Sequence, residues 1–93
     1  MDVQEYPKID LTTFFLSISS AAFHALGLIP GEPGGGAGAA DLMLARQNID
    51  LLELMQEKTT GNRTAEEDKL LDRLLQECRI QYLEVEKTKN AGA

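Results

Sequence analysis

The chain has 93 residues, which is enough for one compact domain and too few for two. Hydrophobic residues make up 43%, a share too high for a disordered chain, whereas aromatic residues make up only 5% and tryptophan is absent. Fifteen acidic and nine basic side chains give a net charge of -6, which repels phosphate backbones and argues against nucleic acid as a partner. We therefore expect a single all-α domain over residues 1–93, with a core of leucine, isoleucine, methionine and alanine.

The cysteine content and the charge distribution bear on the cellular location. Cys78 is the only cysteine, so an intramolecular disulfide and a cysteine metal cluster are both ruled out, as suits a reducing cytoplasm. The first residues lack the positive segment and the apolar core of a secretion signal. Residues 11–31 contain no charged side chain apart from His24, but threonines and serines interrupt this stretch too often for a lipid-facing span of about 20 apolar residues. A cytoplasmic protein without a transmembrane helix is predicted.

A first helix is expected over residues 10–27, after an extended lead-in at 1–9. Asp10 can cap this helix, and Gly27 can adopt the left-handed conformation that ends one. The apolar side chains recur at intervals of three and four, which keeps one face together: Leu11, Phe14, Phe15, Ile18, Ala22, Ala25 and Leu26. Residues 30–40 are mostly glycine, alanine and proline, so a flexible Gly/Ala-rich linker is predicted there.

Two further helices are expected after the linker. Asp41 can cap a helix over residues 41–60, and Gly61 provides its stop. Thr64 and Glu67 match the capping box, so a third helix is expected over residues 64–87, before a frayed tail at 88–93. The short connection around Gly61 predicts that the two helices form a long antiparallel αα-hairpin. Their inner stripes are Leu42, Ala45, Ile49, Leu52 and Met55 in the second helix, and Leu70, Leu71, Leu74, Leu75, Cys78, Tyr82 and Val85 in the third.

The predicted helices carry more apolar surface than one short chain buries. The first is apolar around most of its circumference, and such a helix is normally buried on all sides. A core of this size is marginal, which favours a homo-oligomer, most simply a dimeric helix bundle with two-fold symmetry. The alternative is a three-helix monomer whose extra apolar residues are scattered singly on its surface. The candidate interface, with a second copy or with an unidentified protein partner, consists of Phe14, Phe15, Ile18, Ala22, Leu42, Ile49, Leu52, Leu71, Leu74 and Tyr82.

One formal motif match would suggest nucleotide binding. Gly34, Gly36 and Ala39 have the spacing of the dinucleotide-binding fingerprint, but no strand precedes them. Asp41 would also place a carboxylate at the helix end that should hold pyrophosphate. No cofactor is expected.

The remaining reactive side chains have structural explanations. His24 is the only histidine, and the serines beside it are what the thin polar side of an amphipathic helix needs. Cys78 falls on an inner stripe, where burial makes a thiol inert. The acidic residues 66–68 stabilise the start of a helix through its dipole. No catalytic residue and no metal ligand are predicted.

Three motifs together resemble a bacterial family of domains of unknown function, numbered 1844. They are Gly-Leu-Ile-Pro at 27–30, Ala-Arg-Gln-Asn-Ile-Asp-Leu-Leu at 45–52 and Gln-Glu-Lys-Thr-Thr-Gly-Asn-Arg-Thr at 56–64. The resemblance covers residues 9–83, and the Gly/Ala-rich run at 31–40 departs from it. It implies a small bacterial helical protein with no assigned activity, and it transfers no catalytic residue.

Several polar residues occupy the motif positions of this family, and we treat them as a hypothetical partner-binding patch: Gln47, Asp50, Glu57, Lys58 and Asn62. The competing explanation is that Lys58, Gly61 and Asn62 only end a helix.

The leading functional hypothesis is a non-enzymatic, self-associating helical module that scaffolds or regulates another protein. The first alternative is a peripheral membrane module whose first helix docks on a bilayer through Phe14, Phe15, Ile18 and Ala22. The absence of lysine and arginine from that helix counts against it. The second alternative is an enzyme of unidentified class, for which His24 and scattered carboxylates are the only suggestive groups.

Overall fold

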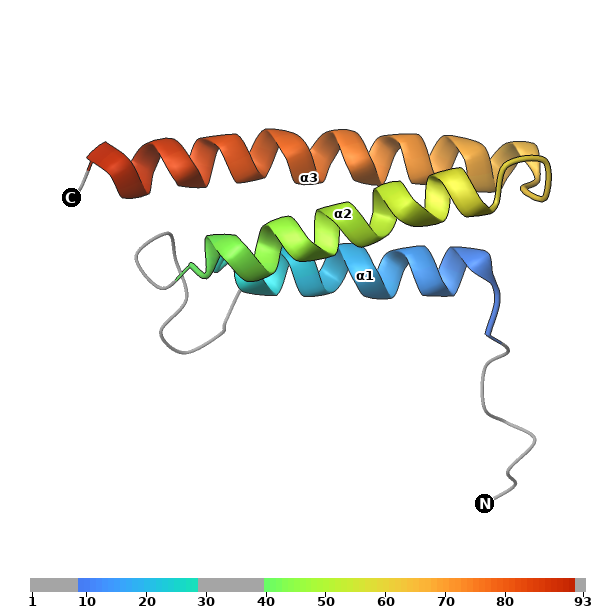
Figure 1. Ribbon diagram of the computed structural model, residues 1–93, viewed down its shortest axis with the longest axis horizontal. Coiled ribbons are helices and arrows are strands. Elements are labelled where there is room, and N and C mark those ends of the chain that lie inside the picture. Colours follow the sequence, from blue (N-terminus) through green and yellow to red (C-terminus); the bar gives the residue numbers. More distant parts are fainter. Residues whose placement is uncertain (1–8, 29–39, 92–93) are drawn as a thin grey trace, which may run out of the picture.

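The computed structural model describes residues 9–28 and 40–91, and within these ranges the chain is helical and contains no strand. The three helices are α1 (Leu11–Ala25), α2 (Leu42–Lys58) and α3 (Ala65–Ala91) (Figure 1). The all-α expectation is confirmed. The predicted linker, except Ala40, and the predicted lead-in, except its last residue, lie outside the described residues.

Both ends of α1 depend on local hydrogen bonds. Asp10 caps the start, where its carboxylate accepts a hydrogen bond of 2.8 Å from the backbone nitrogen of Thr13. This backbone bond holds the pKa of the Asp10 carboxyl below its usual value, because it favours the ionised form. At the other end, Gly27 has a φ of 74° and Leu28 donates from its backbone nitrogen to the Phe23 carbonyl at 3.0 Å.

Helix α2 begins beside the end of α1. The Asp41 carboxylate accepts from the backbone nitrogen of Leu44 at 3.0 Å, which caps α2. The backbone nitrogen of Asp41 itself donates to the Ala25 carbonyl at 2.7 Å, so the start of α2 is joined to the last turn of α1. This bond sets the axial position of one helix against the other.

The turn after α2 depends on a glycine and an arginine. Gly61 has a φ of 83°, and a Cβ there would meet no atom within 4 Å, so it is the backbone angle and not lack of space that calls for glycine. The guanidinium of Arg63 reaches back to the Gln56 carbonyl at 2.6 Å and to the Thr59 hydroxyl at 2.9 Å. These bonds satisfy polar groups at the carboxyl end of α2.

Helix α3 begins with a reciprocal cap. The backbone nitrogen of Glu67 donates to the Thr64 hydroxyl at 3.1 Å, and that of Thr64 donates to the Glu67 carboxylate at 2.7 Å. The helix continues to Ala91, so residues 88–91 are helical and not part of a frayed tail. The extension has a tertiary cause, since the Lys89 ammonium donates to the Ala40 carbonyl at 2.5 Å.

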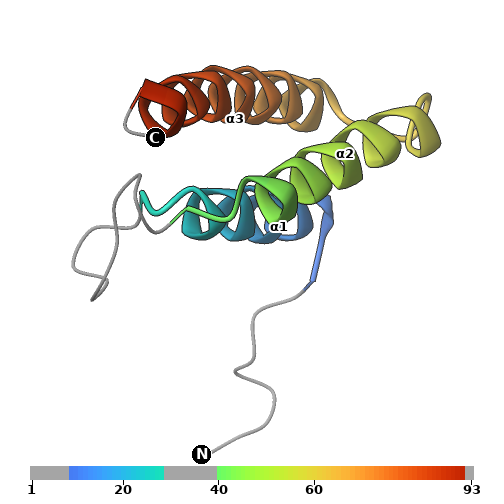
Figure 2. The same cartoon turned by 60° about the vertical axis from the view of Figure 1, so that its left-hand side comes forward.

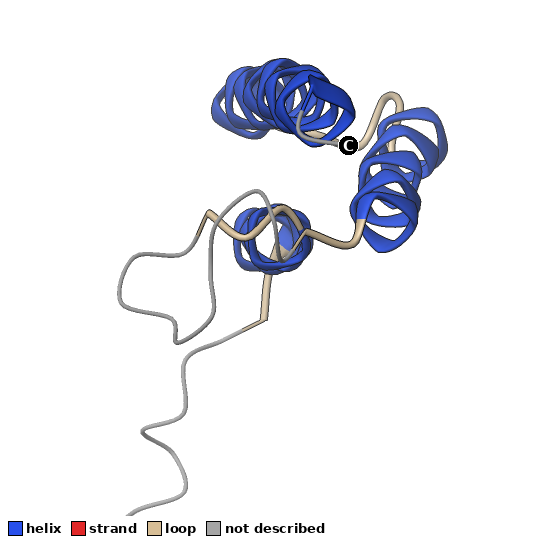
Figure 3. Cartoon of the chain, turned by 90° about the vertical axis from the view of Figure 1, so that its left-hand side faces the viewer, coloured by secondary structure: helices blue, strands red, loops and turns tan. Residues whose placement is uncertain are grey.

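The helices run in alternating directions, α1 opposite to α2 and α2 opposite to α3 (Figure 1). Figure 2 shows α1 and α2 side by side, with α3 across from them. Viewed along their length, the three helices stand at the corners of a triangle (Figure 3). Each helix therefore turns one side toward the centre and keeps another toward the outside.

Two connected groups of buried side chains fill the centre. Cys78 is fully buried in the larger group, whose other members are Phe15, Ile18, Ala22, Ile49, Leu52, Leu71, Leu74 and Leu75. The smaller group closes the end where α1 stops and α2 starts, and it consists of Ala25, Leu26, Ala40, Ala45 and Val85. Tyr82 packs against both groups, so the core is continuous.

Truncation of a core leucine on α3 should be costly. Leu71 is 1% exposed, and we expect Leu71→Ala to lower the free energy of unfolding by roughly 2–5 kcal/mol, because the lost contacts leave a cavity. The matched control is Ile80→Ala on the same helix, where the side chain is 50% exposed and the change should stay within about 0.5–1 kcal/mol. Urea denaturation at one fixed protein concentration measures both. Equal losses for the two variants would contradict the described core.

Candidate functional site

The structure places most of the predicted interface inside one chain. Phe14 is exposed, and Leu42 and Tyr82 are half-buried. The remaining seven are buried in the core: Phe15, Ile18, Ala22, Ile49, Leu52, Leu71 and Leu74. Because α1, α2 and α3 already cover these side chains, they are not available to a partner in this conformation. A partner would meet the residues that the bundle leaves uncovered.

Most of the large apolar side chains that are exposed in the described residues lie on α1 and α2. We define the α1–α2 face by four of them, Phe14 on α1 and Leu44, Leu51 and Leu54 on α2. Each is 41–46% exposed although each lies within a helix that also supplies the core. From sequence alone, only Phe14 was assigned to an interface. The spacing of the three leucines, seven residues and then three, would have placed them on one side of α2.

The two halves of this face adjoin one another. An open hollow between the helices is lined by Ala21, His24, Ala25, Asp41, Leu44 and Asn48. Phe14 lies seven residues before Ala21, and Leu51 lies seven residues after Leu44. Because α1 and α2 run in opposite directions, going from Ala21 to Phe14 and going from Leu44 to Leu51 both move about 10 Å in the same direction along the helix pair. Phe14 and Leu51 therefore lie at a similar level, and the face is continuous.

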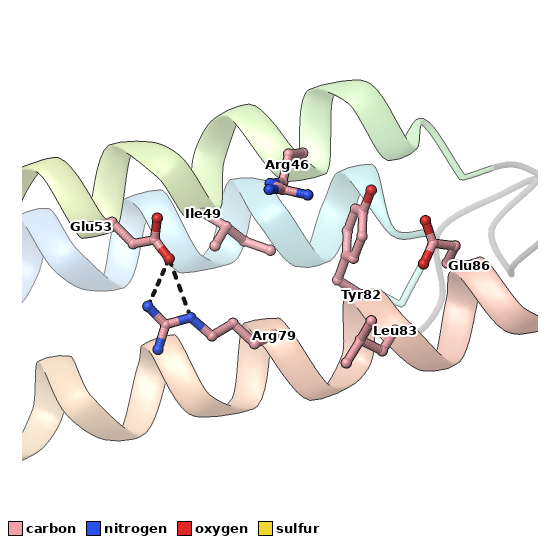
Figure 4. Close-up of a pocket in the computed structure, with 7 residues that line it drawn as sticks. All are labelled: Arg46, Ile49, Glu53, Arg79, Tyr82, Leu83 and Glu86. Atoms are coloured by element: carbon pink, nitrogen blue, oxygen red, sulfur yellow. Dashed lines mark hydrogen bonds and ion pairs between the residues drawn. The ribbon is translucent and has the colours of Figure 1, made fainter.

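A second surface feature is the groove between α2 and α3 (Figure 4). It is lined by Arg46, Ile49, Glu53, Arg79, Tyr82, Leu83 and Glu86. Arg79 donates to one carboxylate oxygen of Glu53 at 2.7 Å and 3.3 Å, which links the two helices. The Arg46 guanidinium lies 5.9 Å from the centre of the Tyr82 ring, within cation–π range.

The charges of this groove are largely compensated within the protein. Arg79 pairs with Glu53, and Arg46 lies 3.5 Å from the Asp50 carboxylate as well as over the Tyr82 ring. Both ion pairs are half-exposed, so each is worth little in free energy. We therefore interpret the groove as a contact that aligns α3 on α2.

The hypothetical polar patch divides into two places. Gln47 and Asp50 line a shallow hollow together with Met43, Arg46 and Tyr82. Glu57 and Lys58 stand in the last turn of α2, about 10 Å farther along the helix, and Asn62 lies in the turn that follows. Asn62 donates from its backbone nitrogen to the Thr59 carbonyl at 2.8 Å, as expected of a residue that helps to end a helix.

The two reactive side chains lie in different environments. Cys78 is buried in the core, and this desolvation raises the pKa of its thiol to about 11, with the charge of Glu77 adding to the effect. His24 is exposed and belongs to the hollow on the α1–α2 face. Among the described residues, no three histidine, cysteine or acidic side chains are grouped so that they could hold a metal ion. None of the described helices has the length and apolarity needed to cross a bilayer.

Comparison with known proteins gives one match. Residues 8–84 match the family model described as Domain of unknown function (DUF1844). No curated protein and no solved structure matches the chain.

Cys78 should be unreactive in the folded protein. Burial raises its thiol pKa from 9.0 to about 11, so at pH 8 the thiolate fraction falls by about 100-fold. We expect Ellman's reagent to modify the native protein at least about 100-fold more slowly than the urea-unfolded chain. The matched control is a Cys78→Ala, Ile80→Cys variant, whose exposed thiol should react at a similar rate in both states. A fast native reaction at Cys78 would contradict its burial.

The Arg79–Glu53 pair should align α3 without contributing much stability. A double-mutant cycle with Arg79→Gln and Glu53→Gln should give a coupling energy below about 1 kcal/mol that shrinks with added salt. The Arg73–Glu77 pair, 3.4 Å apart within α3 alone, is the matched control and should couple by about 0.3–0.5 kcal/mol. Thermal denaturation at low and high salt measures both cycles. A coupling of several kcal/mol between Arg79 and Glu53 would refute this interpretation of the groove.

Proposed function

Because the chain belongs to the DUF1844 family, whose description assigns no activity, we propose its function from its surface: a non-enzymatic helical module that self-associates and scaffolds another protein. The family match over residues 8–84 confirms the resemblance found in the motifs. A role in binding is the function that the α1–α2 face supports best.

One observation carries this proposal, namely that Phe14, Leu44, Leu51 and Leu54 are partly exposed together while the core beneath them is filled. Apolar residues exposed singly are common and need no explanation. A contiguous apolar area is different, because soluble monomers rarely expose a large one. Where such an area is exposed, it marks a surface that binds another molecule. A small helical chain also gains stability when a second copy covers such an area.

The environments of the reactive groups favour binding over catalysis. Cys78 is buried with a raised thiol pKa, the opposite of an activated nucleophile. Asp41, the carboxylate that lines the hollow beside His24, is engaged in capping α2 through the backbone nitrogen of Leu44. The groove between α2 and α3 holds ion pairs in place of a nucleophile beside a base.

Self-association is tested by measuring molar mass against concentration. We expect sedimentation equilibrium between about 1 and 100 µM to show a rise from the 10.2 kDa chain toward twice that mass. Added sodium chloride should leave the association unchanged or strengthen it, since it screens repulsion between chains of charge -6 and does not weaken apolar contact. A chain that remains at 10.2 kDa over this range would contradict the proposal.

A further inference from the structure

The α1 half of the α1–α2 face is distinguished by its lack of charge. Between Leu11 and Ala25, α1 contains no lysine, arginine, aspartate or glutamate, and His24 is its one ionisable side chain. The side of α2 that continues this face carries Leu44, Leu51 and Leu54, with Lys58 in its last turn. Asp41 lines the hollow of this face, where it caps α2. Asp50, four residues before Leu54, lies 3.5 Å from Arg46, and Glu53 is engaged with α3.

This distribution selects among the surfaces through which two copies could meet. Each chain carries a net charge of -6, so two copies repel at most orientations. Helix α3 contributes seven acidic side chains and its outer side is exposed to solvent. An acidic side chain buried at an interface without a partner is costly, whereas α1 brings no carboxylate into a contact through the α1–α2 face, and the Asp41 carboxylate of this face is engaged in capping α2. The repulsion is therefore smaller when two copies meet through this face than when they meet through α3.

The extent of the face suits a dimer. Helices α1 and α2 have 15 and 17 residues, and at 1.5 Å per residue the pair is about 22–25 Å long and about 20 Å wide. Two such faces in contact cover roughly 1,000 Å² in total, which is about the smallest area of a specific protein interface. A smaller contact over α1 alone would not reach it. The whole helix pair is needed.

We infer that two copies join through the α1–α2 face about a two-fold axis, with α1 and α2 of both chains forming a central four-helix layer and α3 of each chain outside. This inference rests on the proposed self-association and names the surface that performs it. At a two-fold interface, each of the four side chains contacts either its own equivalent or another of the four in the second copy. The two α2–α3 grooves then face outward on opposite sides of the dimer.

The test places a charge on the face and, as a control, on a different surface. Leu51→Glu puts one carboxylate per chain, and so two per dimer, into the contact, and should weaken association by roughly 100-fold or more. Leu83→Glu is the matched control, because Leu83 is 59% exposed on α3, and it should associate like the unchanged protein. Sedimentation equilibrium measures both, and circular dichroism checks that each variant stays helical.

A second variant distinguishes weaker association from a folding defect in Leu51→Glu. Ser17 is already exposed, and it lies between Phe14 and Ala21 on the same side of α1. Ser17→Glu should therefore preserve the fold and still weaken association, which would support the inference from the other helix.

Other results would overturn the inference. Dimers that survive both Leu51→Glu and Ser17→Glu would show that a different surface self-associates, while the proposed function would stand. A chain that stays monomeric would contradict the proposed function as well. Monomers that float with zwitterionic phosphatidylcholine vesicles would assign the α1–α2 face to a bilayer in place of a second copy.

Discussion

The structure depends on how much of its surface a helix can bury when it has only two neighbours. In a triangle of three helices, each helix faces the other two over part of its circumference and faces outward over the rest. Helix α3 meets this constraint with charged outer positions. Helix α1 does not, since apart from His24 it has no ionisable side chain to turn outward. This shortage leaves the α1 half of the α1–α2 face without charge.

The bundle is held together differently at its two ends. At one end, the backbone bond from Asp41 to Ala25 joins α2 to α1, and the Lys89 ammonium joins α3 to the residue that precedes Asp41. At the other end, Arg63 binds the last turn of α2, and the cap at Thr64 starts α3 at once. The bond from Asp41 to Ala25 sets the axial position of α1 against α2, and with it the continuity of the α1–α2 face.

The two sides of α2 have separate roles. One side carries Arg46 and Glu53 and meets α3 across a groove in which the charges compensate one another. The other side carries Leu44, Leu51 and Leu54 beside α1, and the Asp41 carboxylate at its start is engaged in capping α2. A charged groove tolerates water, so it can align two helices without being dry. An apolar ridge is stabilised by being covered, which is why we propose that the uncovered side of α2 is the one that binds another molecule.

Local chemistry in the sequence determined the helices, because caps, glycine stops and apolar spacing act within a few residues of one another. Asp10, Asp41 and Thr64 each cap a helix as their sequence context indicates. Tertiary structure decided which apolar residues face inward. A stripe of apolar residues that is wider than one helix–helix contact can be buried along either of its two edges. The tertiary structure buried Phe15 and left Phe14 exposed, although the sequence places both on one stripe, and it extended α3 to Ala91 through Lys89. Those choices arise from contacts between residues far apart in the chain, which no local pattern encodes.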